Sequence, residues 1–356
     1  VDSVKEEELV ENAIEGMLAK LDPHSSYIPQ KEVQKMNEPL EGNFEGIGIQ
    51  FNMLEDTLFV VQTISGGPSE KVGIVAGDRI IFVNDTLIAG VKMQNSDIMK
   101  KLRGKKGTVV NVKILRRGVK KLIDFKIERD KIPIYSLDAA YMLNKETGYI
   151  KLDRFAATTH KEFLDALLRL KSEGMKNLVL DLQGNGGGYL NAAIDLADEF
   201  LSKDKLIVYT EGLRQPRLVE NATSKGDFES GRLVVLIDES SASASEIFTG
   251  AIQDWDRGVV VGRRSFGKGL VQRPIPLTDG SQIRLTIARY YTPTGRSIQK
   301  PYNEGVEKYN KDLIERYNHG ELQHEDSIAF PDSLKKETLL YKRTVYGGGG
   351  IMPDIF

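Results

Sequence analysis

The chain has 356 residues, of which 40% are hydrophobic, as is ordinary for a globular protein of two or three domains. Its 49 Lys and Arg residues nearly balance 51 Asp and Glu residues, so the formal net charge of −2 argues against binding to nucleic acid or an anionic surface. The absence of cysteine excludes disulfides and thiolate metal sites. No apolar run is long enough for a membrane span and no signal peptide is present; the start at Val1 rather than Met suggests a trimmed chain.

Residues 1–41 are predicted to form a helical segment. After the acidic residues 6–8, apolar residues recur at helical spacing, which favours a helix that packs on a neighbour: Val10, Ala13, Ile14, Met17 and Leu18. Residues 21–28 are assigned no chemistry, and we interpret His24 among them as a turn or cap residue rather than a metal ligand.

Residues 42–130 show a different pattern, with short alternating strands separated by glycines and one helix at about residues 95–103. The Gly-Ile-Gly-Ile opening at 46–49 and the glycine-containing runs at 66–69 and 73–80 together resemble a PDZ domain. The alternative is a small β module that only covers a face of its neighbour.

By the PDZ resemblance, these residues would bind the carboxyl-terminal end of a peptide. The loop N–H groups would meet the terminal carboxylate, and the peptide would add to the following strand. The residues implied are Gly46, Ile47, Gly48, Ile49 and Phe51.

From residue 131 onward, strands and helices alternate, which implies parallel crossover connections in an α/β domain. The strand at 177–182 is followed by a glycine-rich loop at 184–188 and then a helix. Such a loop leaves backbone N–H groups facing open space at a helix N-terminus, as an anion-binding loop does. A dinucleotide-binding loop would need glycine where Tyr189 stands, so that alternative is weak. A simple chain reversal stays open.

The next strand and helix enclose three serines. Residues 232–237 predict a buried strand, and the apolar face between residues 244 and 255 predicts a helix. Ser241, Ser243 and Ser245 therefore lie on a strand-to-helix turn, where open α/β sheets place their chemistry. The stretch from Ser243 to Glu246 also fits a helix capping box, and the two roles can coexist.

A serine nucleophile needs a base, and Lys268 is the nearest candidate in sequence. None of the four histidines lies near the serine turn, and no GxSxG motif occurs. A lysine can act as the base if burial or nearby cations lower its pKa. Residues 262–268 also match most of a phosphate-binding Walker A loop, but Gly269 replaces the required Ser or Thr, and the following residues do not favour a helix.

The run SASASE at 241–246, the run FGKG at 266–269 and Gln272 together resemble the signature of the carboxyl-terminal processing peptidases, also called tail-specific proteases. The resemblance implies that Ser243 is the nucleophile and Lys268 its general base. Gln272 would orient the lysine.

The same resemblance assigns an oxyanion hole to the glycine-rich loop. Either Gly187 or Gly188 would act together with the N–H of Ala244. Two positions depart from the family pattern: Gln183 stands where Arg is common, and Gly186 where Pro is common. The loop is therefore expected to be looser than usual, or to need ordering by substrate.

Taken over the chain, the resemblance implies a crotonase-like α/β peptidase core at residues 131–356 and an inserted PDZ domain at 42–130. The expected activity is that of a serine endopeptidase, without metal or organic cofactor, located in the periplasm or cell envelope. Its expected partners are protein or peptide substrates with free carboxyl termini, captured by the PDZ domain. A homo-oligomer or an adaptor partner is left open, as is a latent or inactive core that serves as a peptide-binding scaffold.

Two further stretches carry weaker signals. The polar residues 213–231 predict an irregular loop at the rim of the site, and the charged residues 300–344 predict a partly helical insertion of unassigned function. Within the insertion a metal site is conceivable, but a solvated charged face is favoured. The residues concerned are His319, Glu321, His324, Glu325 and Asp326.

Overall fold

The computed structural model describes residues 5–224 and 226–356, and the chain divides into two compact units. The larger unit combines the residues up to Glu41 with Tyr135–Phe356, and the smaller unit comprises Gly42–Ile134. The helical segment thus belongs with the core, and the smaller unit extends four residues beyond the expected boundary at 130.

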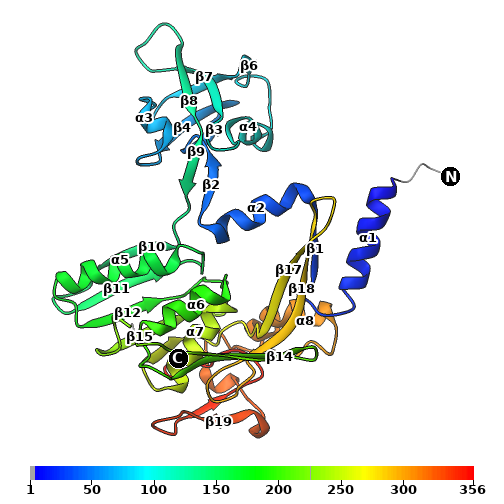
Figure 1. Cartoon of the computed structure of the whole chain (residues 1–356), viewed down its shortest axis with the longest axis vertical. Helices are drawn as coiled ribbons and strands as arrows, with labels where there is room; N and C mark the ends of the chain where they lie inside the picture. The colour runs from blue at the N-terminus through cyan, green and yellow to red at the C-terminus, as the bar shows by residue number, and fades with distance from the viewer. Residues whose placement is uncertain (1–4, 225) are drawn as a thin grey trace. The chain divides into compact units, whose positions relative to one another are not determined.

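The centre of the larger unit is a five-stranded sheet of order β10-β11-β12-β15-β16 (Figure 1). Four of its strands pair in parallel, whereas β10 is antiparallel to β11. The strands are β10 (Leu137–Met142), β11 (Thr147–Leu152), β12 (Asn177–Asp181), β15 (Leu233–Ile237) and β16 (Val259–Gly262). The helices between them are α5 (Thr159–Ser172), α6 (Leu190–Asp198) and α7 (Ala244–Asp254). This confirms the predicted α/β class.

An apolar core fixes these helices against the sheet. The ring of Phe200 contacts those of Phe163, Phe228 and Phe248 at centroid distances of 5.6, 5.9 and 5.4 Å. Each buried ring of this kind contributes about 1.5–3 kcal/mol of transfer free energy. Because β12 and β15 are adjacent and parallel, their carboxyl ends lie side by side. The glycine-rich loop and the serine turn therefore start from neighbouring positions.

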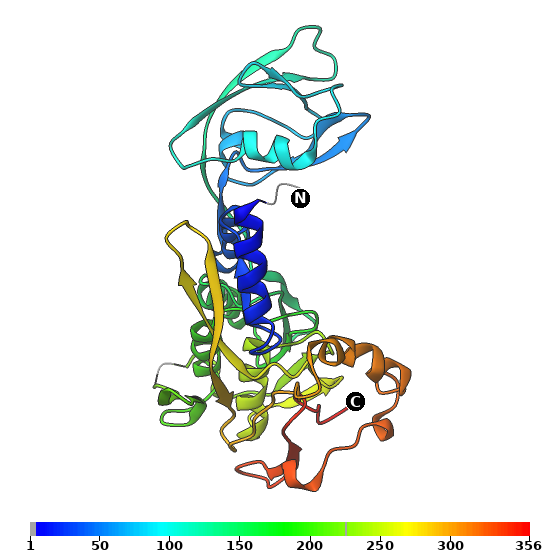
Figure 2. The same ribbon diagram turned by 90° about the vertical axis from the view of Figure 1, so that its right-hand side faces the viewer.

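A second sheet has the order β1-β18-β13-β14, with β17 paired to the opposite edge of β18. Its strands are β1 (Ser26–Ile28), β13 (Leu206–Gly212), β14 (Gln215–Asn221), β17 (Leu270–Pro276) and β18 (Gln282–Tyr291). The antiparallel β17–β18 pair is drawn in gold in Figures 1 and 2. Two prolines at positions 274 and 276 fit β17 because it pairs on only one side, as edge strands that hold proline do.

The expectation of an irregular loop at 213–231 is wrong for its first half, because β14 forms a hairpin with β13. Six of the seven β14 residues are exposed. A strand with so little burial shows no apolar alternation, so its sequence resembles that of a polar loop.

The segment up to Glu41 forms two helices, α1 (Glu6–Leu18) and α2 (Gln30–Glu41), with β1 between them. Leu18 is the buried residue of α1, and the other apolar residues of the predicted packing face are not buried. Among the helices of residues 5–224 and 226–356, none combines the length and apolarity needed to cross a membrane.

The residues after 300 form α8 (Val306–Asn318), the short 3-10 helices η1 (Glu325–Ser327) and η2 (Asp332–Leu334), and the strand pair β19 (Lys335–Glu337) and β20 (Thr344–Tyr346). In Figure 2 they are coloured orange to red. The carboxylate of Glu321 is bound by Arg264 and Arg316, so it is committed to ion pairs. The final segment, residues 347–355, returns to the core, where Ile355 bridges Val261 of β16.

The smaller unit contains a six-stranded sheet of order β3-β4-β5-β7-β8, with β6 on β5, and a separate β2–β9 pair. Its strands are β2 (Asn43–Gly46), β3 (Ile49–Leu54), β4 (Thr57–Thr63), β5 (Arg79–Val83), β6 (Thr86–Leu87), β7 (Val109–Leu115), β8 (Ile123–Glu128) and β9 (Asp130–Pro133). Its helices are α3 (Pro68–Lys71) and α4 (Asn95–Leu102). This unit has an apolar core of its own.

Candidate active site

The serine turn connects β15 to α7 and exposes one of its three serines. Ser241 Oγ donates to the carbonyl of Leu182 at 2.8 Å, and Ser245 Oγ donates to the carbonyl of Asn185 at 2.8 Å, both buried. Ser243 instead lines a pocket. Its φ of 56° is rare for a residue with a side chain, and such strain is concentrated at functional sites.

The carboxylate of Glu246 joins the serine turn to the lysine loop, residues 263–269. One oxygen accepts the N–H groups of Ser243 and Lys268 at 2.8 and 2.9 Å. The other accepts the N–H of Gly267 at 2.7 Å and the Ser265 hydroxyl at 2.5 Å. Burial raises the pKa of Glu246, and these four donors oppose the rise. The predicted capping box is therefore present, but it also holds a second loop.

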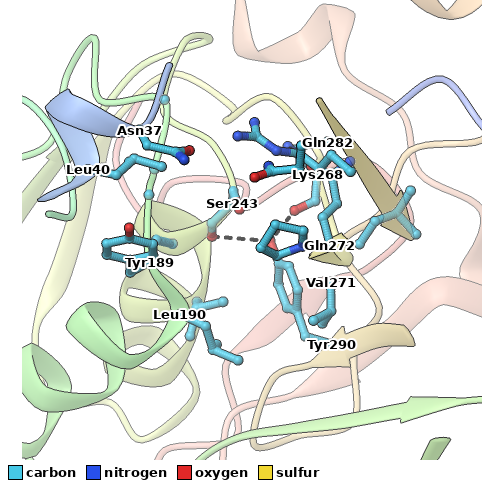
Figure 3. A pocket seen from close by; sticks show the side chains of 18 residues that line it. Asn37, Leu40, Tyr189, Leu190, Ser243, Lys268, Val271, Gln272, Gln282 and Tyr290 are labelled. Carbon is cyan, nitrogen blue, oxygen red and sulfur yellow. Dashed lines mark hydrogen bonds between the residues drawn. The ribbon is translucent and has the colours of Figure 1, made fainter. Parts of the chain in front are cut away.

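Tyr290 of β18 makes a second link between the same two segments. Its hydroxyl lies 3.1 Å from the carbonyl of Ser243 and also bonds to the carbonyl of Lys268 (Figure 3). The side chain is buried, so these carbonyls replace water as its partners. The backbone at the serine and at the lysine is thus held from the second sheet as well.

Lys268 projects into the pocket that Ser243 lines (Figure 3). Its Nζ donates to Oε1 of Gln272 at 3.0 Å, and Nε2 of Gln272 donates to the carbonyl of His24. Burial lowers the pKa of Lys268, and the charge of Arg284 lowers it further, against the opposing effects of Glu246 and Asp22. A lysine in this setting is suited to lose its proton and act as a base.

Within the described residues, the hydrogen bond of Lys268 Nζ goes to Gln272 and not to Ser243. Catalytic hydrogen bonds are often long or absent without substrate and tighten when it binds. The structure therefore brings the serine, the lysine and the glutamine to one pocket and leaves the proton-transfer contact to be formed there.

The two glycines beside Lys268 let the lysine loop approach the backbone at residues 299–300 closely. A Cβ on Gly269 would lie 2.8 Å from the backbone nitrogen of Gln299, and one on Gly267 would lie 3.1 Å from Cβ of Lys300. Gly267 also has φ of +89°, which a residue with a side chain rarely adopts. No helix follows the loop, because β17 starts at Leu270, so the Walker A alternative does not fit.

The glycine-rich loop touches the serine turn directly. A Cβ on Gly187 would lie 2.6 Å from the carbonyl of Ala242 and 2.9 Å from the backbone nitrogen of Ala244. The N–H of Gly187 donates to Oδ1 of Asn185 at 2.9 Å. Among the described backbone hydrogen bonds, neither Gly188 nor Ala244 donates its N–H to an acceptor. These two groups are therefore the readiest donors for an oxyanion.

The glycine-rich loop is held by hydrogen bonds on both sides of Gly186, although Gln183 and Gly186 differ from the family pattern. Gly184 donates to both carboxylate oxygens of Asp238 at 3.0 Å, on one side of Gly186, and the Asn185–Gly187 contact holds the other. Gly186 is exposed, and a Cβ there would meet nothing within 4 Å. Gln183 is exposed as well. The contacts thus do not show the looser loop that these two residues led us to expect.

The pocket has a volume of about 400 Å³ and runs between the serine turn and β17 and β18. Its apolar lining comes from α2, α6, α7 and β17: Leu40, Leu190, Ile247, Leu270 and Val271. Polar side chains line it too: Asn37, Gln282 and Arg284.

Comparison with known proteins identifies the family of the chain. The profile of peptidase family S41 matches residues 146–308, and that of the PDZ domain matches residues 46–127. A carboxy-terminal-processing protease of Bartonella bacilliformis is 39% identical over 299 residues, covering 83% of this chain and 68% of that protein. The chain belongs to the carboxy-terminal processing proteases of peptidase family S41. Members of this family are serine peptidases, as the sequence predicted.

Other relatives give the extent of the match. Carboxy-terminal processing protease CtpB of Bacillus subtilis is 36% identical, over 86% of this chain and 63% of that protein. The chain thus spans about two thirds or less of the length of these relatives. The solved structure of the photosystem II D1 C-terminal processing protease aligns with 83% of this chain and 80% of that chain, at 28% identity and a TM-score of 0.48.

The PDZ domain of this family member has a hollow between β3 and α4. Ile49 and Phe51 line it from β3, and Asn95 and Met99 from α4. The other three residues proposed for peptide binding lie elsewhere: Gly46 ends β2, Ile47 is buried in the core and Gly48 forms a turn with φ of +72°. The structure therefore brings only the two strand residues to the hollow.

Sequence reasoning missed His24, Gln299 and Tyr290 as supports of the S41 site. His24 was assigned to a turn, which it occupies, but its carbonyl also binds Gln272 across 248 positions of the chain. The segments that hold these residues, 21–28 and 290–299, do resemble segments of the processing peptidases, but that resemblance does not show which groups they contact.

Proposed function

We propose that the chain is a serine endopeptidase in which Ser243 is the nucleophile, Lys268 the general base and Gln272 the residue that orients the lysine. The observation that carries the proposal is the state of Lys268. Burial lowers its pKa, its Nζ is held by Gln272 at 3.0 Å, and it opens into the pocket of Ser243. A half-buried lysine whose Nζ bonds to no carboxylate contributes little to folding stability, whereas a neutral amine near a serine can act as a base.

The reaction would proceed in two halves. The neutral Nζ of Lys268 takes the Oγ proton as Ser243 attacks the peptide carbonyl, and the resulting ammonium returns that proton to the leaving amine. Water then attacks the acyl-enzyme, giving one proton to Lys268, which passes it back to Ser243. The N–H groups of Ala244 and Gly188 would hold the oxyanion, because the N–H of Gly187 is already donated to Asn185; each donor is worth about 3–4 kcal/mol in the transition state.

The PDZ domain would select the substrates. A free carboxyl-terminal tail would add as a strand to β3, with side chains directed to the hollow lined by Ile49 and Phe51. Main-chain pairing would give affinity with little demand on sequence, which suits the capture of unfolded tails. An extracytoplasmic location, in the periplasm or cell envelope, stays a prediction that cell fractionation can check.

Cleavage of an unfolded protein with an apolar, free carboxyl-terminal tail tests the dyad. The unmodified chain should cut it, whereas Ser243→Ala and Lys268→Ala should each lose about 10³-fold or more in kcat/KM without loss of folding. The matched control is Ser240→Ala, since Ser240 is exposed on the same turn. Cutting retained by either dyad variant would refute the mechanism. No cutting by the unmodified chain would favour the scaffold alternative.

Peptide binding to the whole chain tests tail capture separately. A peptide with a free carboxyl terminus should bind more tightly than its amidated copy, and Phe51→Ser should weaken binding of the free peptide. Equal affinity for the free and amidated peptides would remove carboxylate recognition from the proposal.

A further inference from the structure

Helix α8 places one tyrosine beside the turn that anchors Gln272. The hydroxyl of Tyr309 lies 2.7 Å from Nε2 of His24, and the two rings meet edge to face with centroids 5.2 Å apart. Gln299 donates to the same hydroxyl at 3.4 Å, which leaves the hydroxyl proton available for His24. Tyr309 thus fixes an imidazole that lies 285 positions away in the chain.

His24 is suited to this contact as a neutral ring. Burial lowers the pKa of His24 to about 4, with a further contribution from the charge of Lys268, so at neutral pH the ring is uncharged and its Nε2 can accept the hydrogen bond of the Tyr309 hydroxyl. The backbone of the same residue is fixed as well. Asp22 accepts the N–H of His24 at 2.8 Å and the hydroxyl of Thr286, on β18, at 3.0 Å. Ring and backbone together hold the His24 carbonyl in one place.

The carbonyl of His24 decides which end of the Gln272 amide faces Lys268. A carbonyl oxygen accepts only from the NH₂ group of an amide, so Nε2 of Gln272 must point to His24. Oε1 of Gln272 must then point to Lys268 Nζ, as it does at 3.0 Å. If the carbonyl of His24 moved, the glutamine could rotate and leave the lysine without its acceptor.

The same helix also holds the lysine loop from behind. Nζ of Lys300 lies 4.0 Å from the ring centroid of Phe266 and 4.3 Å from that of Tyr309, which makes a cation–π link between loop and helix. Gln299, the donor to Tyr309, accepts the N–H of Gly269 at 2.8 Å. These contacts attach α8 and residues 299–300 to the backbone of the lysine loop, whereas the path from the Tyr309 hydroxyl to Nζ of Lys268 passes through His24 and Gln272.

We propose that Tyr309 is a positioning residue of the dyad, which acts through His24 and Gln272 on Lys268, and that α8 braces the lysine loop. This inference rests on the proposed function and extends it to the segment after residue 300. Tyr309 lies directly beyond the part matched by the S41 profile, which ends at residue 308. Among the described residues that line the pocket, none comes from α8, so its effect on catalysis must pass through other residues.

The test is a double-mutant cycle with Tyr309→Phe and Gln272→Ala in the cleavage assay. Tyr309→Phe removes only the hydroxyl, so kcat should fall about tenfold, while KM should stay within about twofold because the pocket lining is intact. In the Gln272→Ala background the same substitution should have no further effect on kcat. The matched control is Tyr317→Phe, an exposed tyrosine on the same helix, which should behave as the unmodified chain.

Each other outcome contradicts the proposal. An unchanged kcat in Tyr309→Phe would show that Tyr309 does not position the dyad. An equal loss of kcat in both backgrounds would show that Tyr309 does not act through Gln272. A parallel rise in KM with an unchanged kcat would assign Tyr309 to substrate binding instead.

A second measurement does not depend on peptidase activity. The pH dependence of Lys268 acylation by an amine-reactive reagent, read by peptide mass spectrometry, reports the pKa of its Nζ. Loss of the Gln272 acceptor disfavours the ammonium, so Gln272→Ala and Tyr309→Phe should shift the midpoint to lower pH, and Tyr317→Phe should not. If the unmodified chain cuts no substrate, the proposed function fails. This titration still tests whether Tyr309 positions Lys268. An unchanged midpoint in Tyr309→Phe would show that it does not.

Discussion

The serine turn and the lysine loop meet at one pocket but are held in different ways. The turn is fixed by its immediate neighbours in the parallel sheet, through Leu182 and Asn185 at the end of β12. The loop and its Gln272 are fixed by segments far away in the sequence, through His24, Gln299 and α8. Between the two, Glu246 is the carboxylate that bonds to both.

This difference separates a preformed half of the site from a dependent half. The serine turn should be less sensitive to changes outside the α/β sheet, since the hydroxyls of Ser241 and Ser245 bond to the end of β12 and the loop after it, although Tyr290 also holds the carbonyl of Ser243. The lysine loop should respond to changes at many distant positions, because its geometry depends on contacts from His24 before β1, from β18 and from α8. Three substitutions can break or sharpen this contrast.

The largest loss of kcat is expected from Gly187→Ala, which alters the contact between the glycine-rich loop and the serine turn in the preformed half. The added Cβ would approach the carbonyl of Ala242 to 2.6 Å, and φ is +97°, so loop and turn must separate. We expect a loss of about 10²–10³-fold in kcat, as for removal of an oxyanion donor. The matched control is Gly186→Ala, whose Cβ would meet nothing within 4 Å and whose kcat should be nearly unchanged. Equal kcat for the two variants would contradict the assigned contact.

A smaller loss of kcat is expected from Glu246→Gln, which changes the carboxylate that bonds to both the serine turn and the lysine loop. The carboxylate accepts two donors on each oxygen, whereas an amide must turn its NH₂ group toward one pair of them. Unpaired buried donors cost about 1–3 kcal/mol each, so both the free energy of unfolding and kcat should fall, kcat by about 10–100-fold. Chemical denaturation and single-turnover kinetics on one preparation measure both. A variant with full kcat would show that the halves align without this carboxylate.

The smallest effect is a shift in pH dependence. The pKa of Lys268 is lowered, and the proposed mechanism requires its neutral amine, so it predicts that kcat/KM rises with pH and levels off above that pKa. Arg284→Gln removes a positive charge that lowers this pKa, so the profile should move to higher pH and activity at a fixed pH on its rising limb should fall by less than about tenfold. Arg289→Gln, exposed on the same strand, serves as control. A profile that moves to lower pH, or no pH dependence at all, would contradict Lys268 as the base.

The preformed half of the site could be predicted from the sequence because its signals are local. A strand, a turn with Ser243 and an apolar helix face follow one another within 25 residues, and the glycines of the neighbouring loop mark a close approach that the structure shows at Gly187. The α/β alternation that places both at one sheet edge is equally visible in the chain. The capping role of Glu246 was also predicted.

For the dependent half, the sequence identified the residues Lys268 and Gln272 but not the contacts that hold them in place. The spacing of Lys268 and Gln272 indicates a pair, yet the partners of that pair come from contacts separated by up to 248 residues in the case of Gln272 and His24. The strand β14 was missed for a different reason, since an exposed edge strand carries no apolar period. In both cases the deciding interaction is with another part of the chain, and one sequence does not reveal pairings of that kind.

The return of residues 347–355 to the core has a consequence for the order in which the protein is made. Ile351 donates its N–H to Ser265 at the start of the lysine loop at 2.6 Å, and Asp354 accepts the N–H of Val260 at 2.8 Å, on the strand before that loop. A ribosome that has synthesised the serine turn must still add about a hundred residues, several seconds of elongation, before these contacts can form. The serine turn can thus form before residues 347–355 exist, whereas the lysine loop gains these contacts only after they are made.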